Sequence, residues 1–170
     1  MLDKIIIKII TSQLIIYTIR CLFGFLIGYH LMIKFPEFEL FWLLLSIVLV
    51  ISPEGKDSRR LTIERVRSNF IGSSVGLVCL QISDELNVGV MVLGIVLTSI
   101  VCYLFKVMNM ARVAIVTLLI ILLQPYLSDI ELTPLLRFAT VFIGCIIGLT
   151  ITVISSVFIR KVKRKYGIAY

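Results

Sequence analysis

The arginines of this sequence are the residues best suited to hold a charged ligand. Arg20 lies within the apolar stretch from Ile15 to Phe23, while Arg65 and Arg137 lie near the ends of apolar stretches, 72 positions apart. A cation at the centre of a bilayer costs about 2.5–3.5 kcal/mol, so a membrane arginine is normally paired, turned inward or functional. An arginine at the mouth of a pore attracts anions. The three arginines are therefore candidate residues for the mouth of an anion pathway.

For the depth of Arg20 we favour a plainer explanation. If residues 4–16 form an interfacial helix, the first span starts near Thr18, and Arg20 reaches the cytoplasmic headgroups. From that depth it can still draw anions towards a mouth. For Arg65 and Arg137 the ordinary explanation is membrane topology or a bond to backbone carbonyls or headgroups. We favour the mouth role for these two because they form a repeated pair.

Uncharged polar residues could line the same pathway. Ser73 offers a hydroxyl and Gln124 an amide that donates to a carboxylate, although hydroxyls in membrane helices more often bond their own backbone. His30 lies near the external end of the first apolar stretch, where it is either a neutral bonded side chain or a group that moves protons. Pro53 and Pro125 each follow an apolar segment, where they either start a loop or break a helix and expose its dipole to an ion.

The sequence lacks the residues that hydrolytic, metal-binding and nucleotide-binding sites need. The sequence has one histidine and no acidic residue within an apolar stretch, so it offers no hydrolytic triad, no metalloprotease site and no buried proton-coupling carboxylate. It contains neither a Walker loop nor a GxGxxG motif. The cysteines are scattered singly, which excludes a zinc site or a disulfide framework; they are Cys21, Cys79, Cys102 and Cys145. We therefore expect no catalytic residue, no metal and no cofactor.

The elements that must position these residues are membrane helices. The mean hydropathy is +1.09 and 59% of the residues are hydrophobic, which indicates a chain that lives in a bilayer. A span needs roughly 20 apolar residues, so 170 residues fit about six spans and no separate soluble domain. We expect an all-α, single integral membrane domain over residues 1–170. The predicted spans cover residues 13–33, 39–52, 68–83, 88–105, 111–127 and 135–159.

The sequence repeats itself at an offset of 72 residues. Residues 41–76 and 113–148 carry identical residues at several equivalent positions. The pairs are Pro53/Pro125, Asp57/Asp129, Arg65/Arg137, Phe70/Phe142, Gly72/Gly144 and Gly76/Gly148. The first repeat covers about 13–83, the second about 85–159, and a basic tail fills 160–170. Each repeat holds three spans, an odd number, so the second copy must face the opposite way if all six cross. We therefore predict two inverted three-helix repeats.

Basic residues predict the orientation. They gather in the first, third, fifth and last connections, whereas the alternate connections hold Lys34 and Arg137 among most of the acidic residues. By the positive-inside rule, both termini lie in the cytoplasm and the protein crosses the inner (plasma) membrane several times. The net charge of +7 is then a topology signal and does not indicate nucleic-acid binding.

Glycines spaced four apart predict close helix packing. Small residues at this spacing let two membrane helices bring their backbones together. The pairs are Gly24/Gly28, Gly72/Gly76 and Gly144/Gly148. Two of the pairs occupy equivalent repeat positions, so we expect the third and sixth helices to pack near the pseudo-two-fold axis.

These residues resemble a known family. A Ser52-Pro53 turn, Gly55 and the run Arg65-x₆-Gly72-x₃-Gly76 resemble the fusaric acid resistance and aromatic acid exporter group, and more distantly the plant aluminium-activated malate channels. Gln124-Pro125 and the stretch from Arg137 to Gly148 complete the resemblance. It implies a helical membrane bundle that moves organic anions outward, often aromatic carboxylates.

The chain is shorter than the larger members of that group, which fuse two membrane units or add a cytoplasmic domain. We expect it to pair with a copy of itself as a two-fold dimer. Its route lies either within a protomer or along the dimer axis. Two other functions remain open: an anion channel of the same fold, and a membrane scaffold or assembly partner that transports nothing.

Overall fold

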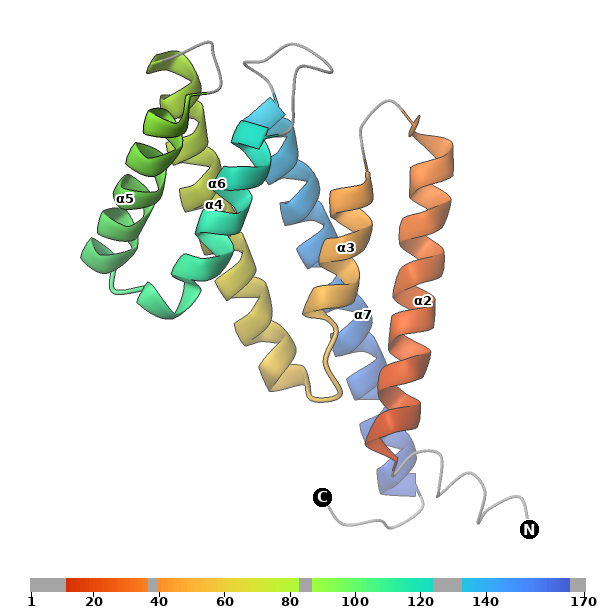
Figure 1. Ribbon diagram of the computed structural model, residues 1–170. Coiled ribbons are helices and arrows are strands. Elements are labelled where there is room, and N and C mark those ends of the chain that lie inside the picture. Colours follow the sequence, from red (N-terminus) through yellow and green to blue (C-terminus); the bar gives the residue numbers. More distant parts are fainter. Residues whose placement is uncertain (1–11, 37–39, 83–86, 124–132, 166–170) are drawn as a thin grey trace. The chain divides into compact units, whose positions relative to one another are not determined.

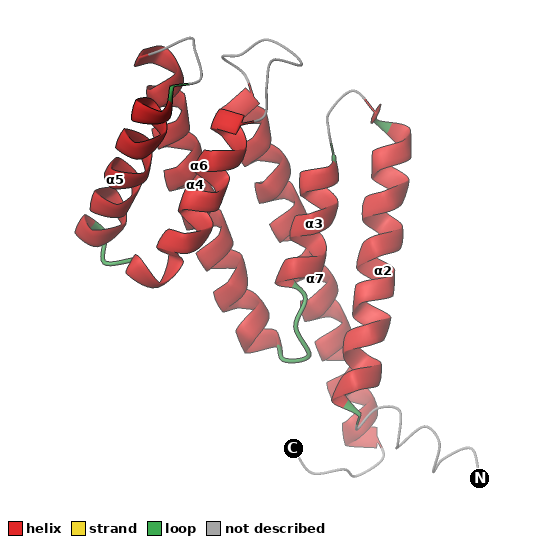
Figure 2. Ribbon diagram, in the orientation of Figure 1, coloured by secondary structure: helices red, strands yellow, loops and turns green. Residues whose placement is uncertain are grey.

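Helices make up all the regular structure that can be described (Figures 1 and 2). The computed structural model describes residues 12–36, 40–82, 87–123 and 133–165. Across these ranges six α-helices agree with the predicted all-α class. The elements are α2 (Gln13–Lys34), α3 (Phe41–Val50), α4 (Gly55–Ile82), α5 (Val88–Leu104), the short 3₁₀-helix η2 (Met108–Met110), α6 (Ala111–Leu123) and α7 (Thr133–Lys165).

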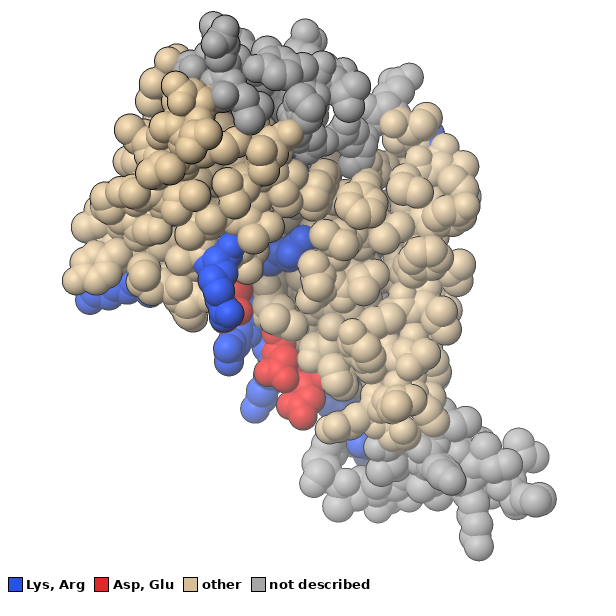
Figure 3. All heavy atoms as spheres, viewed as in Figure 1, with Lys and Arg blue, Asp and Glu red and all other residues tan. Residues whose placement is uncertain are grey.

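Two of the described helices are long and apolar enough to cross a membrane. They are α2 and the stretch Pro134–Arg164 of α7, whereas α3, α5 and the stretch Met108–Leu123 are apolar but shorter. A helix of 10 residues such as α3 is about 15 Å long, half the thickness of a hydrocarbon core. Large apolar side chains stay exposed, including Phe23 (61%) and Leu104 (70%). Much of the face in Figure 3 carries no charged side chain, which suits a lipid environment.

The third helix begins earlier than predicted. We placed it at residues 68–83 behind a basic loop, but α4 starts at Gly55. Its first turns are rich in Lys, Arg, Leu and Glu, which are strong helix formers, and Asp57 in the first turn complements the helix dipole. Hydropathy marks apolar residues and so misses a polar helical segment. The basic residues from Lys56 to Arg67 therefore lie on a helix.

The ends of two other helices also differ from expectation. α7 continues through the basic residues 160–165, which we placed in a tail. α2 runs from Gln13 through Thr18 without a break, so Thr18 does not begin a helix. Most of the interfacial helix expected over residues 4–16 falls outside the described residues.

The chain divides into two compact units. The first joins residues 1–62 to residues 143–170, and the second is the continuous segment 63–142. In the first unit the core lies where α3 meets α2 and α7, and includes Leu43, Ile47 and Ile51. In the second unit α4, α5 and α6 bury Ile71, Val75, Cys79, Cys102, Ala114 and Leu118.

Each unit brings together helices from both sequence repeats. In the first unit a Cβ atom at Gly144 of α7 would lie 2.5 Å from the backbone oxygen of Leu43 in α3. In the second unit a Cβ atom at Gly72 of α4 would lie 2.5 Å from the backbone oxygen of Ala114 in α6. Within each unit, the third helix of one repeat therefore packs closely on the second helix of the other.

Candidate functional site

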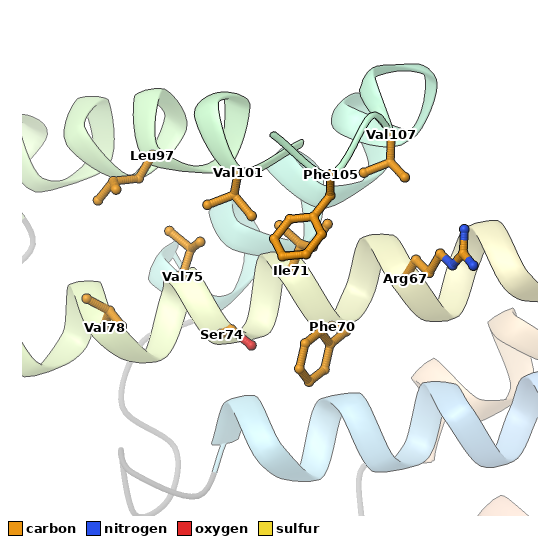
Figure 4. A pocket seen from close by; sticks show the side chains of 10 residues that line it. All are labelled: Arg67, Phe70, Ile71, Ser74, Val75, Val78, Leu97, Val101, Phe105 and Val107. Atoms are coloured by element: carbon orange, nitrogen blue, oxygen red, sulfur yellow. The ribbon is translucent and has the colours of Figure 1, made fainter. Parts of the chain in front are cut away.

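The second unit contains a cavity of about 680 Å³ between α4, α5 and the connection that follows α5 (Figure 4). This volume lies in the range of small-molecule sites. Most of the lining side chains are apolar, two of them aromatic. The lining residues are Arg67, Phe70, Ile71, Ser74, Val75, Val78, Leu97, Val101, Phe105 and Val107.

One continuous face of α4 forms a wall of the cavity. Each of its lining residues has another three or four positions away along the helix, which places them on one side. Arg67 lies at one end of the cavity, and Val78 and Leu97 lie at the other (Figure 4). The eleven steps of about 1.5 Å from Arg67 to Val78 make this wall about 16 Å long.

Arg67 is the single charged residue of the lining, and Ser74 is the single uncharged polar one. The Arg67 side chain is exposed and has no hydrogen-bonding or acidic partner in the part of the chain that the structure describes. A guanidinium presents several donors in a planar fork that suits a carboxylate. The cavity therefore combines an anion-binding group at one end with an apolar body.

Aromatic rings extend this region within the second unit. The ring centroid of Phe70 lies 5.5 Å from that of Phe138 in an edge-to-face contact. The centroids of Phe138 and Phe142 lie 6.0 Å apart in a stacked arrangement. Phe70 and Phe142 occupy equivalent repeat positions, and Phe70 also lines the cavity. The three rings extend the apolar lining to which Phe70 belongs.

The backbone oxygen of each repeated arginine accepts a hydrogen bond from a hydroxyl three residues later. Ser68 Oγ donates to the backbone oxygen of Arg65 at 3.1 Å, and Thr140 Oγ1 donates to that of Arg137 at 3.0 Å. Ser68 and Thr140 are themselves 72 positions apart. Arg137 is 5% exposed, whereas Arg65 is half-buried. Neither arginine lines the cavity.

A buried asparagine joins α4 to α6. Asn69 Nδ2 donates to the backbone oxygen of Arg65 at 2.9 Å, and its Oδ1 accepts from Thr117 Oγ1 at 3.1 Å. Asn69 is 3% exposed. An amide satisfied on both sides in this way fixes the register of two helices, since the alternative is an unsatisfied polar group in an apolar interior.

Ser73, expected in the pathway, is buried one residue before the lining residue Ser74. Among the described residues its hydroxyl has no hydrogen-bond partner, although Thr98 and Thr117 in the same unit donate to carbonyls four residues earlier. Close by, a Cβ atom at Gly76 would meet the side chain of Ile121 at 3.1 Å.

Arg20 belongs to the first unit, where it ties three segments together. It is 3% exposed. Its Nη1 donates to the backbone oxygens of Ser52 (2.6 Å) and Pro53 (2.9 Å), and its Nη2 donates to Ser156 Oγ of α7 (2.9 Å). In the described part of the chain its Nε has no hydrogen-bond partner. The guanidinium thus binds carbonyls beyond the end of α3, where the helix dipole favours a cation.

The remaining predicted residues lie elsewhere. His30 is exposed on α2. On that helix, added Cβ atoms at Gly24 and Gly28 would meet Ile47 of α3 at 2.8 Å and Leu44 at 3.2 Å, respectively. Gln124 and Pro125 fall outside the described residues.

Arg67, Asn69, Phe138 and Ser156 were not among the predicted site residues. Arg67 had a signal: it precedes Phe70, Ile71 and Ser74 at helical spacing. That signal was hidden because we assigned Arg67 to a loop. Asn69, Phe138 and Ser156 acquire their roles only through contacts with other helices.

A known protein family matches most of the chain. A family model described as fusaric acid resistance protein-like matches residues 14–151, most of the 170-residue chain. No curated protein and no solved structure matched the chain. The chain therefore belongs to the fusaric acid resistance protein-like family, whose members are membrane transporters of the efflux or resistance type.

Proposed function

We propose that this protein exports organic anions, aromatic carboxylates among them, across the inner membrane. The observation that carries this proposal is the cavity beside α4, apolar along its length with the Arg67 guanidinium at one end. An apolar cavity with few polar groups is the usual form of a site for a small organic molecule. The cation selects the charge of the solute, and the apolar walls bind its body.

We further propose that all six helices cross the membrane as two inverted repeats, with both termini in the cytoplasm. Two observations support this arrangement. The glycine contacts of α4 and α7 are equivalent in the two units, and so are the hydrogen bonds from Ser68 and Thr140. Arg65 and Arg137 then serve the cytoplasmic and external mouths. The solute passes through each protomer of a homodimer.

Transport by the reconstituted protein tests the function. Proteoliposomes loaded with radiolabelled benzoate should release it faster than liposomes without protein. Arg67→Gln should slow release at least tenfold, whereas Arg59→Gln, an exposed cation of the same helix outside the cavity, should not. Arg65→Ala and Arg137→Ala test the mouths. Equal rates with and without protein would refute the proposal.

The same vesicles separate a coupled exporter from a channel. An exporter saturates with benzoate concentration and drives it against a gradient when energised. Flux that never saturates and always runs downhill would instead assign the protein to the anion channels.

A further inference from the structure

We infer that the preferred cargo of the cavity is a carboxylate with one unbranched alkyl tail of about 10–14 carbons. This inference rests on the proposed export of organic anions and specifies the substrate class. It follows from three properties of the cavity: its length along α4, the position of its cation and the chemistry of its far end.

Length sets the size of the tail. The wall from Arg67 to Val78 extends about 16 Å. An extended polypeptide spans about 3.3–3.6 Å per residue over three backbone bonds, or about 1.2 Å per bond. We apply the same advance per bond to an extended alkyl tail. A tail of a dozen or so carbons therefore extends from the guanidinium to the far end of the cavity.

The distribution of charge selects a monoanion. Arg67 holds the single positive charge of the lining, and the opposite end is formed by Val78 and Leu97 (Figure 4). A dicarboxylate bound at Arg67 would place its second charge against these apolar side chains, which is costly without a partner. A carboxylate with an uncharged tail meets no such penalty.

The volume disfavours compact acids. A single aromatic ring bound at Arg67 would leave the α4 wall towards Val78 unfilled. A longer tail buries additional methylenes against Val75, Val101 and Leu97, and each buried methylene strengthens binding about fourfold. Affinity should therefore rise with tail length until the tail reaches Val78.

Binding of a homologous series to the protein in nanodiscs tests this inference. Hexanoate, octanoate, decanoate and dodecanoate are titrated, and partitioning into protein-free nanodiscs is subtracted. The corrected affinity should rise about fourfold per methylene. Val101→Trp, which fills the cavity, should weaken dodecanoate binding at least tenfold. Ile100→Trp is the matched control, because Ile100 is exposed on α5 and does not line the cavity.

A second variant covers the possibility that Val101→Trp does not fold. Val78→Trp narrows only the far end and should weaken dodecanoate at least tenfold while octanoate binding changes less than twofold. Arg67→Gln should weaken every member of the series by a similar factor.

Three results would overturn the inference. One is a corrected affinity independent of tail length. Another is equal loss of dodecanoate binding in Val101→Trp and Ile100→Trp. The third is a phospholipid that copurifies with the protein, is lost in Val101→Trp and is not displaced by dodecanoate. Benzoate export without tail-length dependence would refute the inference alone, whereas dodecanoate binding without carboxylate export would refute the proposed function alone.

Discussion

Substitution of Gly72 by alanine tests the closest helix contact in the second unit. The added Cβ atom would lie 2.5 Å from the backbone oxygen of Ala114 and 2.8 Å from Thr117 Cβ. Ordinary contacts begin at 3.4 Å, so the first distance is 0.9 Å too short. A backbone oxygen cannot rotate away as the end of a side chain can. We therefore expect α4 and α6 to separate.

The expected loss of stability combines two opposing terms. Overpacking of this kind costs about 1–3 kcal/mol, and replacing a helical glycine by alanine returns about 0.5–1 kcal/mol. The central values of the two terms leave a net destabilisation of about 1 kcal/mol. For a chain of this size this corresponds to a fall in Tm of about 2–4 °C.

Thermal unfolding in detergent, followed by circular dichroism, measures this change. Gly144→Ala, the repeat equivalent, should lose a similar amount, since its Cβ atom would lie 2.5 Å from the backbone oxygen of Leu43. Gly89→Ala is the control, because the nearest atom to its Cβ would be Asn87 Oδ1 at 3.5 Å. If Gly72→Ala and Gly89→Ala unfold at the same temperature, the backbone contact between α4 and α6 does not exist.

Four further predictions follow from individual contacts. Arg20→Gln should cost about 2–3 kcal/mol in unfolding experiments because it removes donors from buried carbonyls, and Arg20→Lys should not restore the loss; wild-type stability of Arg20→Gln would contradict the bonds to Ser52 and Pro53. Asn69→Leu should cost about 1 kcal/mol, and no loss would mean that the bond from Thr117 contributes nothing. Ser73→Ala should stay within about 0.5 kcal/mol of the wild type, whereas Ser68→Ala, which loses a hydrogen bond, should cost about 1 kcal/mol; a larger loss at Ser73 than at Ser68 would reverse this assignment. In a chain without native cysteines, Lys34→Cys should react with an impermeant thiol reagent from outside and Arg164→Cys only from inside, and labelling of both from one side would refute the inverted repeats.

The helical class and the approximate positions of the helices were predictable from the sequence. Apolar stretches and glycine spacing can be read directly from the order of the residues. α2, α5 and α6 accordingly begin within one residue of the predicted spans. The spacing could not show which helix faces each glycine. Gly72 faces α6 and Gly144 faces α3. Each of these glycines therefore contacts a helix of the other repeat, which depends on packing between distant parts of the chain.

The site was less predictable because its cation lies on a polar part of a helix. Hydropathy placed the start of the third helix at residue 68, which removed Arg67 from the surface that Phe70 and Ser74 share. Arg20 shows a different limit. Its apolar surroundings signalled a buried or functional cation, but its partners Ser52, Pro53 and Ser156 come together only in the folded unit.

The division of the chain has a consequence for biogenesis. The segment 63–142 is continuous, so a ribosome has delivered all of it before the last helix is complete, and domains can assemble during synthesis. The other unit needs Gly144 and Gly148 to close against α3. α2 and α3 must therefore wait for α7, and the surface of α3 that Gly144 and Gly148 later cover stays uncovered during that interval.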